Sequence, residues 1–240
     1  MSGAAPLRRD LPWVLLATAL SYPLGLVVGM AWLLPVLNVA PAYLAMVLRL
    51  RRGEAKEAVT LMLAWALALA VCGTITLALW PAPTDALVLN GPAYRDEMWR
   101  WIRTGEGREG DWRAFLPQHL GHLAAFVLLC LVTASAASMV MGAALMNFMG
   151  FYVASLLRAG LPASAALLFG WQPWAICRVA AFVILGVVLA DPLLARLQKR
   201  TRAWSLRPWL VAAAVLIAGD WLLKALLAPT WGRVLRDAVP

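Results

Sequence analysis

Three charged residues lie inside long apolar segments of the chain, where an ionised side chain is costly. Arg178 follows Pro173 by five residues, and Asp220 and Lys224 stand four residues apart, on one face of a helix. Ionisable groups at membrane depth usually pair with one another or serve function. In one interpretation Asp220 and Lys224 neutralise each other and Arg178 extends to the headgroups. We expect the other: Arg178 approaches Asp220 across a helix interface, Lys224 is released towards the outer surface, and the group lines a path for an ion or solute.

The two histidines of the chain are close together, in the motif Gln-His-Leu-Gly-His. Spaced three residues apart, His119 and His122 would face one side of a helix and both reach one metal ion, with acidic residues of segment 81–118 as further ligands. A zinc site normally needs three or four ligands, so hydrogen bonding at the membrane interface is the simpler interpretation of the pair. No cofactor is predicted, because P-loop, GxGxxG, HExxH and GxSxG motifs are absent from the sequence.

Small residues are concentrated between positions 134 and 144, and Asn147 follows them. Small side chains let helices approach closely in lipid. This segment is therefore expected at the centre of the bundle, or at a contact with other membrane subunits or a second copy of the chain. An Asn at membrane depth needs a hydrogen-bond partner. We therefore add Asn147 to the candidate polar cluster of Arg178, Asp220 and Lys224.

The composition identifies the class of protein. The 240 residues are 63% hydrophobic and 14% charged, with a mean hydropathy of +0.77. Soluble domains are about one-quarter charged, so a water-soluble enzyme domain is excluded. Three Cys cannot make a disulfide framework. The net charge of +9 comes from basic residues between apolar segments, which indicates cytoplasmic loops of a membrane protein and not a nucleic-acid groove.

Apolar segments form one predicted membrane domain. They cover 11–48, 58–80, 119–157, 165–190 and 208–228, with a polar segment at 81–118. Lys and Arg are in excess in segments 49–57 and 191–207 but not in 81–118. The two basic segments should therefore be cytoplasmic and segment 81–118 external, in a cell membrane or inner membrane.

The number of spans follows partly from these charges. The chain must cross the bilayer an even number of times between the two basic segments, so 119–157 should cross twice, with a turn near Ser138 to Gly142. In segment 11–48, a hairpin would keep Arg8 and Arg9 inside and give seven spans. A single span followed by a surface helix over 42–50 would give six, and the break between Pro35 and Pro41 favours six. The predicted fold class is thus an all-α transmembrane bundle of six or seven spans.

Segment 81–118 contains its own predicted helix. Tyr94, Met98, Trp101 and Ile102 recur at helical spacing among charged residues, so 94–103 should form an amphipathic helix along the outer surface. The glycine-rich stretch 104–111 is then either a plain connector or a lid over a cavity near His119 and His122.

Three functions fit these features. The first is a permease-like or channel-like protein that moves a small solute or ion between segment 119–157 and the last two apolar segments. The second is a non-catalytic subunit or scaffold of a membrane complex. The third is a membrane enzyme acting at the outer headgroup level with His119 and His122, which is less favoured because no carboxylate pair is spaced for acid–base chemistry. An enclosed pocket that holds both histidines and an acid would favour this third function.

Overall fold

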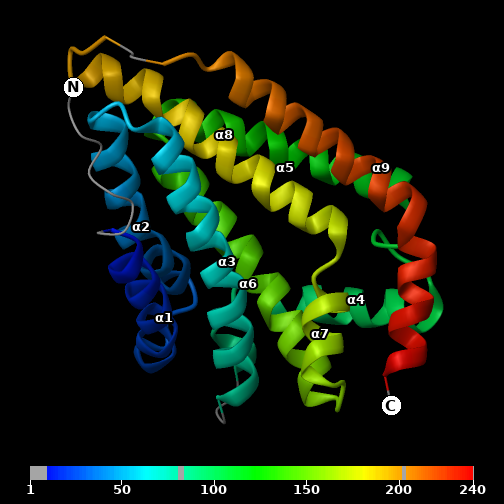
Figure 1. The fold of residues 1–240 in the computed structure, drawn as a ribbon. Coiled ribbons are helices and arrows are strands. Elements are labelled where there is room, and N and C mark those ends of the chain that lie inside the picture. Colours follow the sequence, from blue (N-terminus) through cyan, green and yellow to red (C-terminus); the bar gives the residue numbers. More distant parts are fainter. Residues whose placement is uncertain (1–9, 81–83, 202–203, 240) are drawn as a thin grey trace.

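The computed structural model describes residues 10–80, 84–201 and 204–239, and this part of the chain is all-α (Figure 1). Within these residues, seven helices are long and apolar enough to cross a membrane: α1 (Leu11–Val28), α2 (Leu33–Arg51), α3 (Ala55–Leu79), α5 (Trp112–Thr133), α6 (Ala136–Arg158), α8 (Pro173–Leu197) and α9 (Arg207–Ala238). The shorter elements are the 3-10 helix η2 (Thr84–Ala86), α4 (Gly91–Thr104) and α7 (Ala163–Gly170). The chain is a multi-pass membrane protein.

The first apolar segment is a helical hairpin, α1–α2, so the expectation of six spans was wrong. Pro35 lies in the first turn of α2, where its missing N–H is not needed, and Pro41 lies inside α2 without ending it. The predicted surface helix is instead inside the bundle, since Ala42, Met46 and Leu50 are fully buried. Packing against neighbouring helices stabilises a proline-containing helix in a membrane, which the local sequence does not reveal. Arg8 and Arg9 lie outside the described residues.

Segment 119–157 crosses twice, as the charge distribution predicted, through α5 and α6. The turn between them is at Ala134 and Ser135, both with positive φ, and not at Ser138 to Gly142, which lie inside α6. The Ser135 hydroxyl donates to the Gly186 carbonyl at 2.6 Å and so attaches the turn to α8. As a result the α2–α3 and α8–α9 connections lie at one end of the bundle, and α4 lies at the other (Figure 1).

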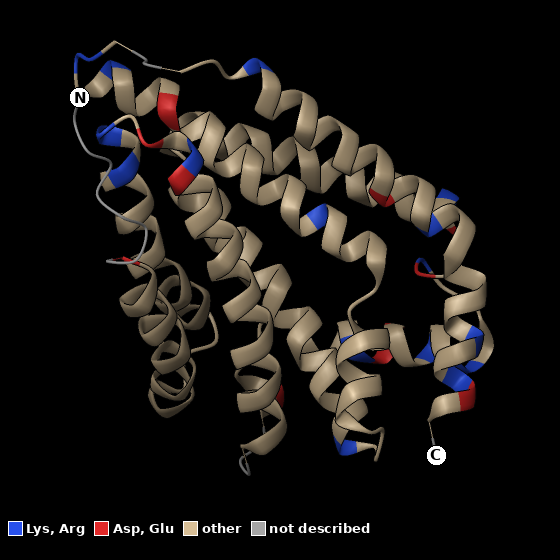
Figure 2. Cartoon of the chain, in the orientation of Figure 1, with Lys and Arg blue, Asp and Glu red and all other residues tan. Residues whose placement is uncertain are grey.

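Four helices form a closed ring: α3 packs on α6, α6 on α5, α5 on α8, and α8 on α3. The hairpin α1–α2 covers α3 on one side, while α9 runs along α8 on the other. Helix α9 bends towards its C-terminal end, where Pro229 interrupts its hydrogen bonding (Figure 1). Figure 2 shows that charged residues gather mainly at the two ends of the bundle. The interior of the ring is the place where a site can form.

The amphipathic helix predicted for 94–103 is present as α4. Met98, Trp101 and Ile102 are buried, and Arg100 is exposed, as expected. The buried face packs on α6 and on the C-terminal part of α9. Helix α4 therefore lies across the end of the bundle.

Asn147 belongs to a neutral hydrogen-bond network between α1, α2 and α6. Its Nδ2 donates to Asn38 Oδ1 at 2.9 Å, and Tyr22 Oη donates to Asn147 Oδ1 at 2.7 Å. Asn38 Nδ2 continues the network to Ser21 Oγ at 2.7 Å. Helix α3 approaches Tyr22 closely at Gly73, where a Cβ atom would lie 2.5 Å from the phenol oxygen. The network holds the hairpin α1–α2 against the ring and does not include Arg178.

The substitution Asn147→Leu should destabilise the protein by about 1–3 kcal/mol, because it leaves Asn38 Oδ1 buried without its donor. The free energy of unfolding can be measured by SDS titration in mixed micelles. Thr60→Val is the matched control, since the exposed Thr60 hydroxyl bonds only to the carbonyl of Lys56. A loss no larger than that of the control would contradict a stabilising role for the network.

Candidate functional site

The ring of α3, α6, α5 and α8 encloses a cavity of about 410 Å³. Its lining is polar at the α4 end, where Glu97, Gln118, His122 and Arg178 contribute. Farther in, its lining is apolar and includes Phe126, Met139, Met146 and Phe182. The cavity thus changes from polar to apolar along the axis of the bundle.

The cavity extends through only part of the bundle. Along α6 its lining residues run from Met139 to Met149, which corresponds to about 15 Å at 1.5 Å per residue. That is about half of the ~30 Å hydrocarbon core. At this end the Met139 and Phe126 side chains pack against α8, with Met139 Sδ 3.2 Å and Phe126 Cζ 3.6 Å from a Cβ atom added at Gly186, and the lining does not continue past Met139. In this conformation the cavity is a cup that faces α4, and not a pore.

Arg178 and Asp220 form an ion pair between α8 and α9. Arg178 donates from Nε to Asp220 Oδ2 at 3.0 Å and from Nη2 to Oδ1 at 2.9 Å. Asp220 is fully buried, whereas 23% of the Arg178 side chain is exposed. The two residues approach each other as the sequence led us to expect. Such a two-point pair of guanidinium and carboxylate is stronger than a single hydrogen bond.

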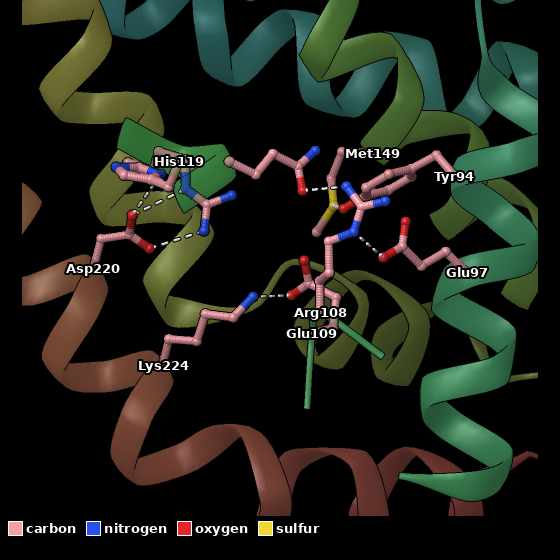
Figure 3. Close-up of polar contacts among 10 residues, drawn as sticks. Tyr94, Glu97, Arg108, Glu109, His119, Met149, Asp220 and Lys224 are labelled. Atoms are coloured by element: carbon pink, nitrogen blue, oxygen red, sulfur yellow. Dashed lines mark hydrogen bonds and ion pairs between the residues drawn. The ribbon is translucent and has the colours of Figure 1, made fainter. Parts of the chain in front are cut away.

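Lys224 is buried, so the expectation that it is released towards the outer surface was wrong. Its ammonium group donates to Glu109 Oε2 at 2.7 Å (Figure 3). Between the two ion pairs lies the Phe115 ring, with Lys224 Nζ 3.7 Å and Arg178 Cζ 4.6 Å from the ring centre. Both cations can interact with the π face of this ring.

Glu109 lies in the loop between α4 and α5, outside the membrane-spanning helices. Burial alone would raise the pKa of its carboxyl group, but the neighbouring cations Lys224 and Arg178 outweigh this effect and hold the pKa below its ordinary value. Glu109 is therefore ionised at neutral pH. The cluster thus has two basic side chains, Arg178 and Lys224, each paired with one acidic side chain, Asp220 or Glu109.

The two histidines reach the same cavity. His119 is buried, and its Nδ1 lies 3.6 Å from Asp220 Oδ2 (Figure 3). Its Nε2 has no hydrogen-bond partner among the described residues. His122 is half-buried and also lines the cavity. The described residues include no group of three or more His, Cys, Asp or Glu that could hold a metal ion, so the structure gives a metal at His119 and His122, the less favoured interpretation, no third ligand.

A second polar layer crosses the mouth of the cavity. Arg108 donates from Nη1 to Gln118 Oε1 at 2.7 Å, and its Nε lies 3.3 Å from Glu97 Oε1 (Figure 3). Arg108 and Glu109 come from the glycine-rich loop, which therefore lies over the cavity. Our sequence reasoning did not select Glu97, Arg108 or Glu109. The signal in the sequence that could have led to Arg108 and Glu109 is their position in the glycine-rich stretch next to the histidines.

Comparisons with protein-family models, with curated proteins and with solved structures found no match for this chain. The function is therefore argued from the geometry of the cavity.

The ion pair between Arg178 and Asp220 should show strong coupling in a double-mutant cycle. Arg178→Ala alone should cost about 3–5 kcal/mol, because it leaves a buried carboxylate unpaired, and Arg178→Ala with Asp220→Ala should cost less than the sum of the two single changes. The free energy of unfolding in mixed micelles gives the coupling energy.

The control cycle uses Arg95 and Asp85, a more exposed pair in the polar segment with an N–O distance of 3.3 Å. Its coupling should be about 0–1 kcal/mol. If the two cycles gave equal coupling, the pair between α8 and α9 would not be a structural determinant.

Proposed function

We propose that this multi-pass membrane protein is a permease-like carrier that binds a small solute in the cavity inside the ring of α3, α6, α5 and α8. The observation that carries this proposal is the shape of the cavity, a cup of about 410 Å³ whose lining ends where the Met139 and Phe126 side chains pack against Gly186. A carrier holds its solute in a site that is closed on one side at a time, whereas a channel needs a continuous path. The closed end therefore favours a permease over a channel.

The charges around the cavity support a solute binding site over an ion path. Arg178 is paired with Asp220, Lys224 with Glu109, and Arg108 with Glu97. A selective ion path normally presents a ring of charges of one sign. Since each cation here is paired with an anion, the site does not favour ions of one sign.

A membrane enzyme acting at the headgroup level is the second candidate. It is favoured by the lining of the cavity, which includes both histidines and Glu109, and by the contact of His119 with Asp220. A histidine next to a carboxylate in a cavity is a candidate general base. The scaffold alternative has less support, because Ser135, Ser138 and Ala143 of the small-residue segment are buried within the chain itself.

We infer that the α4 end faces the outside of a cell membrane. The support is the location of the basic segments 49–57 and 191–207 at the opposite end of the bundle, together with the positive-inside rule.

The orientation can be tested with single cysteines in a background without Cys72, Cys130 and Cys177. In intact cells an impermeant thiol reagent should label Glu106→Cys, which is in the loop next to α4. It should label Ser205→Cys, in the α8–α9 connection, only after the membrane is made permeable. Both wild-type residues are exposed, so accessibility in the protein is matched. The reverse pattern would refute the orientation.

A carrier should expose the cavity to both sides in turn. In the same cysteine-free background, Gly142→Cys places a thiol in the lining of the cavity. We expect an impermeant reagent to label it in right-side-out vesicles and, in a separate preparation, in inside-out vesicles. Gly121→Cys, on an exposed face of α5 with no atom within 4 Å of its added Cβ, should remain unlabelled in both preparations. Labelling of Gly142→Cys from one side alone would reject the carrier and favour the enzyme.

A further inference from the structure

The inner part of the cavity selects for an apolar group. It is lined by Phe126, Met139, Met146, Phe182 and Val183, from α5, α6 and α8. A wholly polar solute placed there would lose its hydrogen bonds to water without replacement, at a cost in free energy. Unbranched methionine side chains adapt to flexible apolar chains. The ligand therefore needs an apolar portion that can extend to the closed end.

The outer part of the cavity offers both donors and acceptors. Arg178 uses Nε and Nη2 for Asp220, and its Nη1 makes no hydrogen bond within the described part of the chain. The Glu109 carboxylate lines the cavity, accepts from Lys224 through Oε2 and has Trp174 as a further hydrogen-bond partner, and a carboxylate has additional acceptor sites beyond these two. His122 adds a ring nitrogen to the lining. A polar head that both donates and accepts fits these groups.

The balance of charge decides what kind of head this is. Each cation near the cavity has a carboxylate partner, at N–O distances of 2.9 Å for Arg178 and Asp220, 2.7 Å for Lys224 and Glu109, and 3.3 Å for Arg108 and Glu97. An anionic or cationic head would add a charge that no group compensates, which is costly at membrane depth. A zwitterionic or hydroxyl-bearing head adds none.

We infer that the ligand of this cavity is a single-chain amphiphile whose polar head has no net charge. Its head lies beside Arg178, Glu109 and His122, and its chain lies between α5, α6 and α8. This inference rests on the proposed function, because it names the class of solute that the carrier would bind. The polar end of the cavity is next to α4, where the headgroup region would be. A bound amphiphile would therefore keep its head at the level of the lipid headgroups and its chain at the level of the lipid chains.

The inference can be tested by native mass spectrometry of the purified full chain with three probes. Lysophosphatidylcholine has a zwitterionic head and one chain, oleate has one chain and an anionic head, and glycerophosphocholine has the zwitterionic head without a chain. We expect one lysophosphatidylcholine per chain, at least about tenfold weaker retention of oleate, and no retention of glycerophosphocholine.

Two variants with matched controls address the two ends of the cavity. Gly142→Leu projects a side chain into the apolar end, where the added Cβ would be in ordinary contact with Phe126 at 3.6 Å, and should reduce lysophosphatidylcholine binding at least about tenfold. Gly121→Leu makes the same change on the exposed face of α5 and should bind like the wild type.

At the polar end, Glu97→Gln removes one anion from the lining and should shift the ratio of binding towards oleate. Glu106→Gln removes an exposed anion in the loop after α4 that does not line the cavity, and should leave the ratio unchanged. Equal melting temperatures of the variants and the wild type, measured in the same detergent, would show that folding is not the cause.

Wild-type binding by Gly142→Leu, or retention of glycerophosphocholine, would overturn the inference. An unchanged ratio in Glu97→Gln would overturn the part that concerns the head. The carrier proposal has a separate test. It fails if Gly142→Cys is not labelled from both sides of the membrane, whatever the binding experiments show. Amphiphile binding combined with one-sided labelling would support this inference and reject transport.

Discussion

The pairing of charges between α8, α9 and the loop before α5 is the constraint on which the arrangement of the site depends. A single unpaired charge at membrane depth costs about 2.5–3.5 kcal/mol on insertion scales, so Arg178 and Asp220 must face each other. Their two hydrogen bonds set the rotation of α8 and α9 and their relative depth. Lys224 is one turn farther along the same face of α9, so the same rotation directs it to Glu109. One requirement of electrostatics therefore positions two helices and a loop.

The same pairing explains how a buried cluster can remain available to a ligand. Helix α9 lies outside the ring, so Asp220 contacts Arg178 from the side of α8 that faces α9. Asp220 is fully buried there. Arg178 is held at one edge of its guanidinium group and is still partly exposed. The cavity thus contains a fixed donor whose charge is already balanced, which suits recognition of a neutral polar group better than capture of an ion.

The other half of the bundle is stabilised by different groups. Between α1, α2 and α6 the buried polar atoms belong to neutral amides and hydroxyls, among them those of Asn38, Asn147 and Tyr22. A buried charge is present at the end opposite α4, where Arg49 lies against Asp10 at 2.7 Å and Glu54 at 3.1 Å. Helices α3 and α6 join the two halves of the bundle. They pack on α1 and α2 in the half without the cavity, and on α5 and α8 in the half that contains it.

The sequence alone determined the features that depend on local pattern or total charge. Helical spacing predicted α4, and the excess of basic residues in two connections required α5 and α6 to be two spans. The pair of Arg178 and Asp220 was predictable because Asp220 is the acid available in a neighbouring span. These inferences needed no knowledge of how the helices pack.

Tertiary structure decided the features that depend on which helix faces lie together. Pro41 remains inside α2 because neighbouring helices pack around it, and the turn at Ala134 relies on the contact of Ser135 with α8. The partner of Lys224 is 115 positions away in the sequence, in a loop with no fixed spacing to α9. Periodicity and charge are properties of one segment, whereas a contact depends on the rotation and depth of two segments, which only packing sets.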